Sequence, residues 1–291
     1  MNQPIDWSNV VAASFRVQQT IRYDYPSAIT DLRHKLMISP RAEHGNQIRT
    51  SNDLAVIPDS AQDSDFDAFG NEVITIDVPR IEKSISFVLT SDVVRDTRIG
   101  QHYEDTSFAK KNFRASNRRL IRADVNLNRI AADLRVRYLK REELAYAISD
   151  FVYNEMVYTH DVTDVFTTGA TAFEMRRGVC QDYAHIAITL SRLCGLAARY
   201  VSGYLIGEGA THAWVEFLIP SGPNETRVLS LDPTNDCVTN LKYIVVGIGR
   251  DYDDVAPTSG FFTGKSAGTI TSCQSVRVTD LTYAAPALTA A

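Results

Sequence analysis

The sequence predicts an α+β protein, with a β-sandwich-like N-terminal domain and a core in which a helix packs against an antiparallel sheet. Short strand-like segments separated by proline, glycine, asparagine and aspartate fill residues 12–94. A segment with helical spacing begins at Cys180, and strand-like segments follow at residues 211–217 and 228–232. We therefore divide the chain into an N-terminal β domain, a helical linker and a core, at residues 1–100, 101–140 and 141–291.

Composition and charge limit the classes to which the protein can belong. Its 291 residues suffice for one large or two ordinary domains. The formal net charge of −5 argues against a nucleic-acid partner. The sequence has no apolar run that could span a bilayer, and residues 1–7 lack the pattern of a signal peptide. We therefore expect a cytoplasmic protein that does not bind membranes and whose four cysteines stay reduced.

The N-terminal region carries several strand patterns. Residues 15–23 are rich in β-formers, and residues 84–90 alternate, with Ile85, Phe87 and Leu89 on one face. Leu36, Ile38 and then Pro40 end another run, and further strands are expected at residues 47–57 and 73–78. Short strands separated by turn residues are typical of a sandwich or a curled sheet.

The middle of the chain is expected to be helical. Residues 105–137 are basic and contain apolar residues at helical spacing, which favours a solvated linker because aromatic residues are not interleaved. Residues 141–158 show a clearer helical pattern. Thr171 and Glu174 have the spacing of a capping box, which predicts a short helix that stops at Gly178.

Cys180 lies where a glycine turn leads into a helix. Apolar residues keep helical spacing as far as Leu193, and Gly195 marks the end. Backbone N–H groups and the positive end of the helix dipole favour a thiolate at such a position by about 0.3–1 kcal/mol. This contribution is too small to activate a nucleophile by itself, so a basic partner is required.

Two later segments offer partners for Cys180. His212 begins the strand-like segment 211–217, and Asp232 ends the segment 228–232. Cysteine, histidine and aspartate are the residue types that thiol acyl transfer requires. The histidine takes the thiol proton, the carboxylate orients the histidine, and the thiolate attacks a carbonyl. The backbone N–H of Cys180 is the expected first donor to the resulting oxyanion.

Five segments, in family order, resemble the core of the bacterial transglutaminase-like superfamily, whose members are often described as cysteine proteases. They read GVCQDYAH, ARYVSGYL, THAWVEF, LDPTN and GRDYDDVAP, and begin at residues 178, 198, 211, 231 and 249. Residues 24–94 resemble the N-terminal domain that accompanies this core. The resemblance implies a papain-like thiol fold with Cys180 as nucleophile, His212 as base and Asp232 as orienting acid.

The positions of other residues in the expected helix and strands suggest roles for them. Trp214 shares a strand face with His212, so it either forms a wall of the site or belongs to the core. Trp214 and Tyr183 are the candidate substrate-binding residues. His185 lies about 140° around the helix from Cys180, so we expect a structural role for it. The segment from Arg250 to Asp254 fits a rim of the site and a structural ion-pair turn equally well.

No metal or cofactor is expected. The sequence has no C-x-x-C and no paired histidine spacing, and isolated residues such as Cys194, Cys237 and Cys273 are usually small buried hydrophobes.

Three functions remain open from the sequence. The first is a cysteine protease or amidase that acts on a peptide or protein substrate. The second is amide transfer to an amine, as in a transglutaminase, and the third is a catalytically silent binding module. We favour hydrolysis, because excluding water takes dedicated walls that the sequence does not plainly show. The sequence carries no prediction of oligomeric state.

Overall fold

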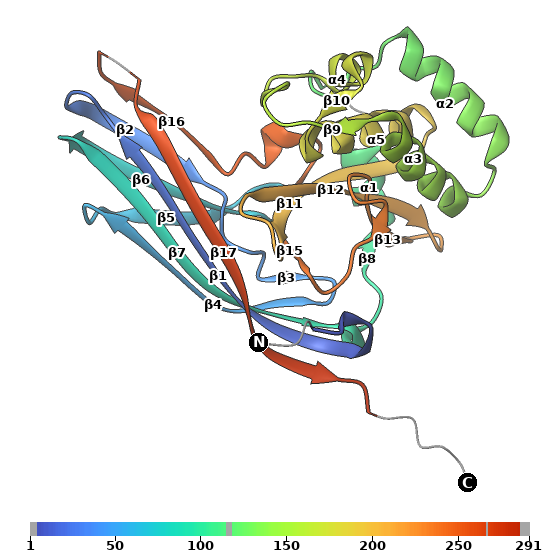
Figure 1. The fold of residues 1–291 in the computed structure, drawn as a ribbon, viewed down its shortest axis with the longest axis horizontal. Helices are drawn as coiled ribbons and strands as arrows, with labels where there is room; N and C mark the ends of the chain where they lie inside the picture. The colour runs from blue at the N-terminus through green and yellow to red at the C-terminus, as the bar shows by residue number, and fades with distance from the viewer. Residues whose placement is uncertain (1–4, 115–117, 266, 286–291) are drawn as a thin grey trace.

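The computed structural model describes residues 5–114, 118–265 and 267–285, so predictions for residues 1–4 and 286–291 lie outside the described residues. Two sheets packed face to face form one side of the molecule, and a curved sheet carrying helices forms the other (Figure 1). This arrangement confirms the predicted α+β class and the strand-rich N-terminal region.

The first sheet of the sandwich is antiparallel and has the strand order β17-β1-β7-β4-β3. These strands are β1 (Val10–Asp24), β3 (Glu43–His44), β4 (Gln47–Ile57), β7 (Ser84–Asp96) and β17 (Thr269–Tyr283). Ile85, Phe87 and Leu89 of β7 are fully buried, as their alternation predicts. They face the second sheet and form the sandwich core with it.

The second sheet has the order β16-β2-β6-β5. Its strands are β2 (Ile29–Leu36), β5 (Gln62–Phe66), β6 (Glu72–Ile81) and β16 (Thr258–Thr263). Leu36, Ile74 and Ile76 supply its inner face, each at most 5% exposed. The run expected to end at Leu36, Ile38 and Pro40 is β2, which ends at Leu36.

The chain returns to the sandwich after the core, which corrects one part of the predicted division. Residues 141–291 were assigned to the core, but β17 pairs with β1 along its length and β16 pairs with β2. Figure 1 shows β1 in blue beside β17 in red. The physical reason is that β17 covers the edge of β1 that β7 leaves unpaired, and no local pattern in the sequence reveals a pairing between segments so far apart. The other predicted boundaries stay predictions.

The core sheet is antiparallel and has the order β14-β13-β12-β11-β15, and β8 pairs with β13. Its strands are β8 (Tyr103–Asp105), β11 (Ala197–Leu205), β12 (Thr211–Pro220), β13 (Glu225–Asp232), β14 (Cys237–Val238) and β15 (Tyr243–Gly249). Helix α5 (Cys180–Leu193) packs against β11 and β12 through a core that contains Ala184, Ile188, Val215 and Phe217.

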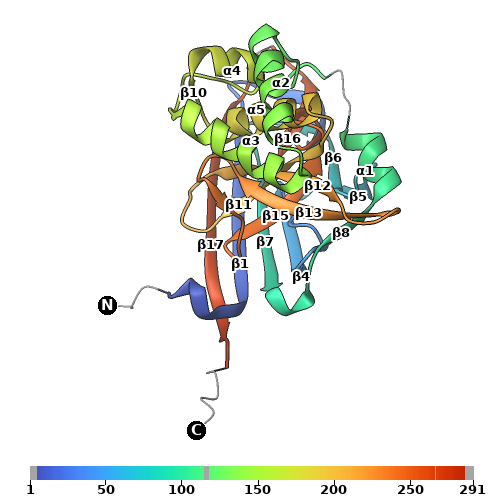
Figure 2. The same cartoon turned by 90° about the vertical axis from the view of Figure 1, so that its right-hand side faces the viewer.

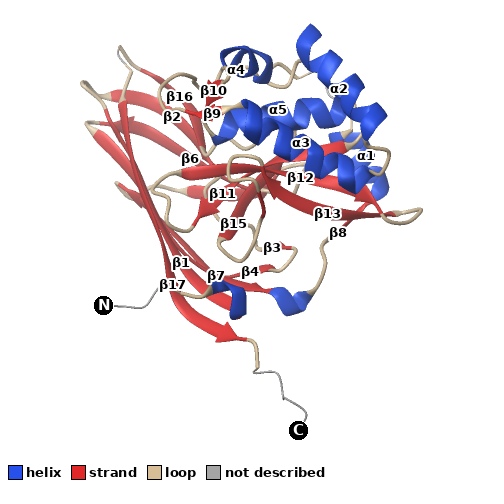
Figure 3. Ribbon diagram, turned by 45° about the vertical axis from the view of Figure 1, so that its right-hand side comes forward, coloured by secondary structure: helices blue, strands red, loops and turns tan. Residues whose placement is uncertain are grey.

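The remaining helices are α1 (Thr106–Phe113), α2 (Val125–Arg137), α3 (Arg141–Glu155) and α4 (Gly169–Met175). Helices α2, α3 and α4 lie on the same side of the core sheet as α5 (Figures 2 and 3), whereas α1 packs against the alternate residues Ala197, Leu218 and Val228, on the other face. Helices α2, α3 and α4 all contact α5, which is therefore almost entirely buried. Among the described residues, we find no helix with the length and apolar character needed to cross a membrane.

Two helix boundaries differ from the sequence-based expectation. Helix α3 ends at Glu155, and Val157–Tyr158 form β9, which pairs in parallel with β10 (Arg177–Gly178). Helix α4 starts at Gly169, and Thr168 caps it by accepting the N–H of Thr171 at 3.1 Å. The capping box expected at Thr171 is therefore wrong. A glycine at the helix start is explained by packing, because a Cβ on Gly169 would lie 3.2 Å from the backbone of His185.

The sandwich is joined to the core by two side-chain amides that pair with β15. The Gln47 amide donates to the Val245 carbonyl and accepts its N–H, each at 2.8 Å. Asn71 makes the same pair of bonds with Ile248, at 2.8 and 2.9 Å. Gln47 and Asn71 are fully buried, so these bonds satisfy backbone groups that would otherwise be costly to bury.

Candidate active site

Cys180 is the first residue of α5, and its position depends on the turn before it. Asp182 accepts the N–H of Val179 at 2.8 Å and the hydroxyl of Thr163 at 2.7 Å. A Cβ on Gly178 would lie 2.4 Å from Asp182 Oδ2, so this turn requires glycine. Burial raises the pKa of Asp182. The N–H groups of Asp182 and Tyr183 donate to the Val179 carbonyl at 2.8 and 3.3 Å, and Cys180 itself is half-buried.

His212 and Asp232 meet at the ends of neighbouring strands. His212 is the second residue of β12 and Asp232 is the last residue of β13. The His212 Nε2 atom lies 2.7 Å from Asp232 Oδ2, and both residues are buried. The carboxylate therefore holds a proton on Nε2 and leaves Nδ1 to face the other groups of the site.

Three further groups hold the Asp232 carboxylate in place. Asn235 and the Tyr243 hydroxyl donate to Oδ2 at 2.7 and 2.8 Å, and the N–H of Thr234 donates to Oδ1 at 2.9 Å. Burial alone would raise the pKa of Asp232, but hydrogen bonds with His212, Asn235 and Thr234, together with the charge of His212, lower it. Asp232 is therefore an anion buried in a fully hydrogen-bonded setting.

His212 also interacts with Cys180 and Glu208. Burial lowers the pKa of His212, but the hydrogen bond with Asp232 and the interactions with Cys180 and Glu208 outweigh this effect and raise the pKa to about 12. Glu208 Oε2 lies 3.2 Å from His212 Nδ1. The His212 ring thus hydrogen-bonds Asp232 and also interacts with the Cys180 side chain.

The two predicted substrate-binding residues are buried. Trp214 is 1% exposed and stacks on the His212 ring, with centroids 6.2 Å apart. Gly203 makes room for it, because a Cβ there would lie 2.5 Å from the indole. Tyr183 is 2% exposed and belongs to the core beneath α5. In this structure Trp214 supports His212 from behind, and neither side chain offers a surface to a substrate. The substrate-binding assignment stays a prediction without geometric support.

Two exposed residues beside Cys180 were not predicted. Tyr158 is 45% exposed, and β9 carries it next to Gly178, two residues before Cys180. Burial is the main cause that raises the pKa of Tyr158, and the charges of Cys180 and Glu208 add to it. Glu208, whose side chain is 40% exposed, belongs to the turn between β11 and β12. No motif spacing reveals either residue, since both reach the site through the pairing of separate segments.

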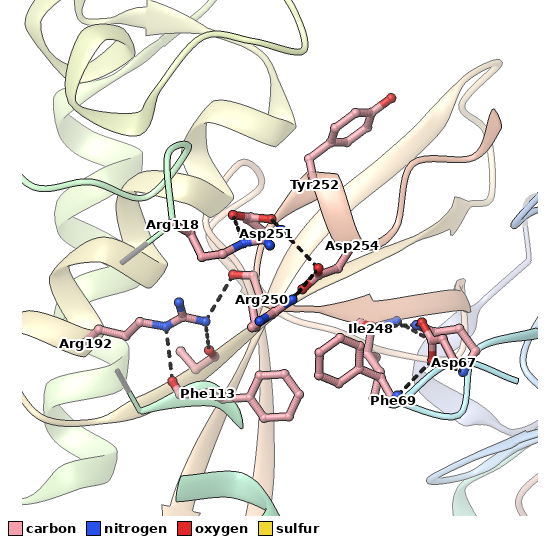
Figure 4. Close-up of polar contacts among 12 residues, drawn as sticks. Asp67, Phe69, Phe113, Arg118, Arg192, Ile248, Arg250, Asp251, Tyr252 and Asp254 are labelled. Carbon is pink, nitrogen blue, oxygen red and sulfur yellow. Dashed lines mark hydrogen bonds and ion pairs between the residues drawn. The ribbon is translucent and has the colours of Figure 1, made fainter. Parts of the chain in front are cut away.

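The segment from Arg250 to Asp254 forms an ion-pair turn (Figure 4). Arg118 binds both carboxylate oxygens of Asp251, at 2.6 and 2.9 Å, and also contacts Asp254 at 3.0 Å. Arg250 donates to Asp254 at 2.7 Å. Next to this turn, the N–H of Tyr252 donates to His185 Nε2 at 3.2 Å.

His185 has the structural setting expected for it. It is completely buried, and burial lowers its pKa to about 4, so the ring is neutral at physiological pH. Its Nε2 can therefore accept the N–H of Tyr252, which ties α5 to the ion-pair turn.

Of the other cysteines, Cys237 lies beside Asp232, with which it pairs across β13 and β14. Cys194 is buried, and burial raises its pKa to about 11. Cys237 is half-buried and contacts the Tyr243 hydroxyl at 3.3 Å, whereas Cys273 is exposed on β17. Within the described ranges, side chains spaced to hold a metal gather elsewhere, at His44, His102 and Glu216.

Comparison with known proteins identifies related sequences and folds. The model of the transglutaminase-like superfamily matches residues 128–233, and the model of the bacterial transglutaminase-like N-terminal region matches residues 15–94. Uncharacterized proteins of Mycobacterium tuberculosis and Mycobacterium bovis are 39% identical over 147 residues, which is 46% of this chain and 47% of theirs. The match therefore spans about half the length of these curated relatives.

Two further comparisons extend over most of the chain. An uncharacterized protein of Mycobacterium leprae is 29% identical over 272 residues, which cover 87% of this chain and 94% of that protein. A crystal structure from Cytophaga hutchinsonii, described as a "Putative Cysteine Protease", aligns with a TM-score of 0.74 over 94% of this chain and 93% of its own. At 20% sequence identity, this likeness establishes the fold.

The two matched regions correspond to the two parts of the structure. Residues 15–94 contain most of the sandwich, and residues 128–233 contain Cys180, His212 and Asp232. The chain therefore belongs to the transglutaminase-like superfamily and carries the bacterial N-terminal region of that superfamily before its core.

Proposed function

We propose that the protein is a thiol hydrolase of amide bonds, either a cysteine protease or an amidase. The observation that carries the proposal is the buried His212–Asp232 pair, 2.7 Å apart, whose His212 ring also interacts with the Cys180 side chain at the N-terminus of a buried helix. A peptide or protein is the proposed substrate. The fold of a structure described as a cysteine protease agrees with this chemistry.

In the first step, the Cys180 thiolate attacks the carbonyl carbon of the amide. The N–H of Cys180 donates to the oxyanion that forms, assisted by the positive end of the α5 dipole. His212 then transfers its Nδ1 proton to the leaving nitrogen, and the C–N bond breaks. An amine leaves, and a thioester joins the acyl group to Cys180.

In the second step, neutral His212 takes a proton from water as the water oxygen attacks the thioester. The C–S bond breaks, the carboxylic acid leaves and Cys180 returns as thiolate beside the imidazolium. We favour water over an amine as the acceptor because Tyr158 and Glu208, which flank Cys180, are both at least 40% exposed. An acceptor site that excludes water would need these flanks to be closed.

The first experiment measures alkylation of each cysteine against pH by peptide mass spectrometry, in the parent protein and in His212→Ala. Cys273 is the control for an exposed thiol and Cys194 for a buried one. We expect Cys180 to react much faster than Cys273 near neutral pH, and to lose that advantage in His212→Ala. Equal rates for Cys180 and Cys273 in the parent would contradict an activated nucleophile.

The second experiment separates the functions that share a reactive thiol. Peptide libraries are incubated with and without a primary amine, and product masses are recorded. Hydrolysis of a peptide bond gives two fragments that together gain the mass of one water, and hydrolysis of a side-chain carboxamide adds water minus ammonia. Transfer at the same carboxamide adds the mass of the amine minus ammonia and occurs only when amine is present. A Cys180→Ala variant that preserves the cellular role of the protein would favour a binding module.

We also propose that the enzyme works in the cytoplasm, where a thiolate nucleophile is kept reduced. Cell fractionation in a native host tests this assignment, and recovery of the protein outside the cytoplasm would overturn it.

A further inference from the structure

A cluster of potential metal ligands lies away from Cys180, where the sandwich meets the core sheet. His44 on β3, His102 before β8 and Glu216 on β12 each direct one ligand atom into a common space, and these atoms all lie within 4.8 Å of one another. Figure 1 shows β3 and β8 at this junction, beside the core sheet. The three residues come from segments far apart in the sequence.

The backbone around the cluster fixes the two histidines close together. His44 pairs with Gln47 across a two-residue turn, and Gly45 in that turn has a φ of +56°. A Cβ on Gly45 would lie 3.2 Å from the Cβ of His102, so the close approach depends on glycine. The N–H of Val228 on β13 donates to the His102 carbonyl at 3.0 Å, which anchors the second histidine to the core.

The Glu216 carboxylate is fixed by contacts to both of its oxygens, as carboxylates that bind metals commonly are. Glu216 Oε1 lies 2.7 Å from His44 Nε2, while Arg199 Nε donates to the other oxygen, Oε2, at 2.6 Å. Arg199 also binds Glu104, whose Oε1 lies 3.5 Å from His102 Nε2. Both are outer-shell contacts typical of metal sites. In the first an arginine anchors one oxygen of the ligand carboxylate, and in the second an acidic residue lies behind a ligand histidine.

The cluster can be reached from solvent. It lines a cavity of about 550 Å³ whose walls include His44, His102 and Glu216 together with Arg95, Trp214 and Tyr146. The His102 side chain is 20% exposed, whereas those of His44 and Glu216 are 6% and 4% exposed. An ion could therefore enter past His102 and reach the two buried ligands.

The spacing requires only small movements. Ligand atoms about 2.0–2.1 Å from one tetrahedral zinc ion lie about 3.4 Å apart. His44 Nε2 and Glu216 Oε1, now hydrogen-bonded at 2.7 Å, would separate slightly to take an ion between them. The partly exposed His102 ring, whose centroid is 4.6 Å from that of His44, would rotate to supply the third ligand. Two histidines and one carboxylate suit divalent first-row metals such as zinc, and leave coordination positions for water.

We propose that His44, His102 and Glu216 form a binding site for a divalent transition-metal ion, with an open coordination position toward the cavity. The bound ion joins the β3–β4 hairpin of the sandwich, the segment before β8 and strand β12 of the core. It is separate from the Cys180 site and does not depend on the proposed hydrolase activity.

The test uses Cys180→Ala protein, because a thiolate beside His212 would itself bind zinc. Equilibrium dialysis against Zn²⁺ with elemental analysis should give one ion per chain. His102→Ala should weaken binding by about tenfold or more, whereas His160→Ala, at an exposed histidine outside the cluster, should leave it unchanged. Zinc should also raise the melting temperature of the parent and of His160→Ala, but not of His102→Ala.

Two further measurements exclude misfolding of the variant and binding of zinc by a cysteine as explanations of the result. Circular dichroism verifies the fold of His102→Ala, and His44→Gln, which can still hydrogen-bond Glu216, provides a second variant that should lose zinc. Co²⁺ substitution reports the ligand type, because thiolate coordination gives an intense charge-transfer band that histidine and carboxylate do not. Absence of stoichiometric binding, equal affinity in folded His102→Ala and parent, or a thiolate band would each overturn the proposal.

Discussion

Asp232 accepts hydrogen bonds from His212, Asn235 and Tyr243 on a single oxygen, Oδ2, of which the His212 bond is 2.7 Å long. These donors come from β12, from the turn after β13 and from β15. The carboxylate is thus fixed from several directions before any substrate arrives, and the orientation of His212 follows from it. Such preorganisation lowers the reorganisation required during proton transfer.

Replacing Asp232 by asparagine should lower the pKa of His212 from about 12 toward its ordinary value near 6.5. The physical reason is the loss of the buried negative charge that stabilises the imidazolium. NMR titration of the His212 ring nitrogens measures the change directly. Asp236→Asn, the same substitution at an exposed neighbour, should leave the titration unchanged. An unaltered His212 titration in Asp232→Asn would contradict the assigned pair.

The His212–Asp232 pair should also make stability depend on pH. The pKa of His212 is raised in the folded state, so its contribution is complete below about pH 6.5 and declines as pH rises toward 12. The pKa of Asp232 is lowered, so its contribution is lost as pH falls below its unfolded value near 3.8. Urea unfolding across this range should show a decline in the free energy of unfolding above about pH 6.5. This decline should be absent in Asp232→Asn.

Glu208→Gln should accelerate alkylation of Cys180 by about two- to fivefold at low salt. Glu208 contacts the same nitrogen of His212 that must face Cys180, and its negative charge disfavours a thiolate nearby. The gain should shrink in high salt, because the Glu208 side chain is 40% exposed and its charge is screened. Glu174→Gln is a matched control at an exposed position. Slower alkylation in Glu208→Gln would show that Glu208 assists the thiolate.

Gly178→Ala should destabilise the protein by about 1–3 kcal/mol and slow alkylation of Cys180. The added methyl group would lie 2.4 Å from Asp182 Oδ2, so the turn that places Cys180 must shift. Gly209→Ala is the control, because a Cβ there meets nothing within 4 Å, and its effect should stay within about 0.5 kcal/mol. Urea unfolding and peptide mass spectrometry give the two readouts. Full stability and reactivity in Gly178→Ala would contradict the packing argument.

Asp251→Asn should cost about 2–3 kcal/mol of stability, and Asp253→Asn less than about 1 kcal/mol. The two aspartates are neighbours in the same turn, but the Asp251 side chain is fully buried against Arg118, whereas the Arg119–Asp253 pair is 48% and 43% exposed. Urea denaturation of both variants provides the comparison. Similar losses would mean that burial does not strengthen the Arg118 pair.

Local patterns in the sequence predicted the strands of the sandwich and the helix that starts at Cys180, because each depends on periodicity within a few residues. His212 and Asp232 could be chosen for the same reason, since each lies at the edge of a readable strand. The error at Thr171 has a tertiary cause. Packing of Gly169 against α5 moved the helix start to a cap at Thr168.

Other features depend on contacts that no local pattern encodes. Tyr158 reaches Cys180 through a parallel β9–β10 pair, and β17 reaches β1 across almost the whole chain. The sequence does not reveal the metal-ligand cluster, because His44, His102 and Glu216 lie in three different segments and none has a second ligand at a characteristic spacing. Paired spacing is the signal by which a sequence reveals ligands, and it is missing when three separate segments each supply one.

The pairing of β1 with β17 has a consequence for biosynthesis. Residues 10–24 leave the ribosome early, but residues 269–283 emerge only after the core has been made. Until then β1 has an open edge, which is a site for mispairing or chaperone binding. Completion of the sandwich, against which the core packs, therefore waits until residues 269–283 have been made.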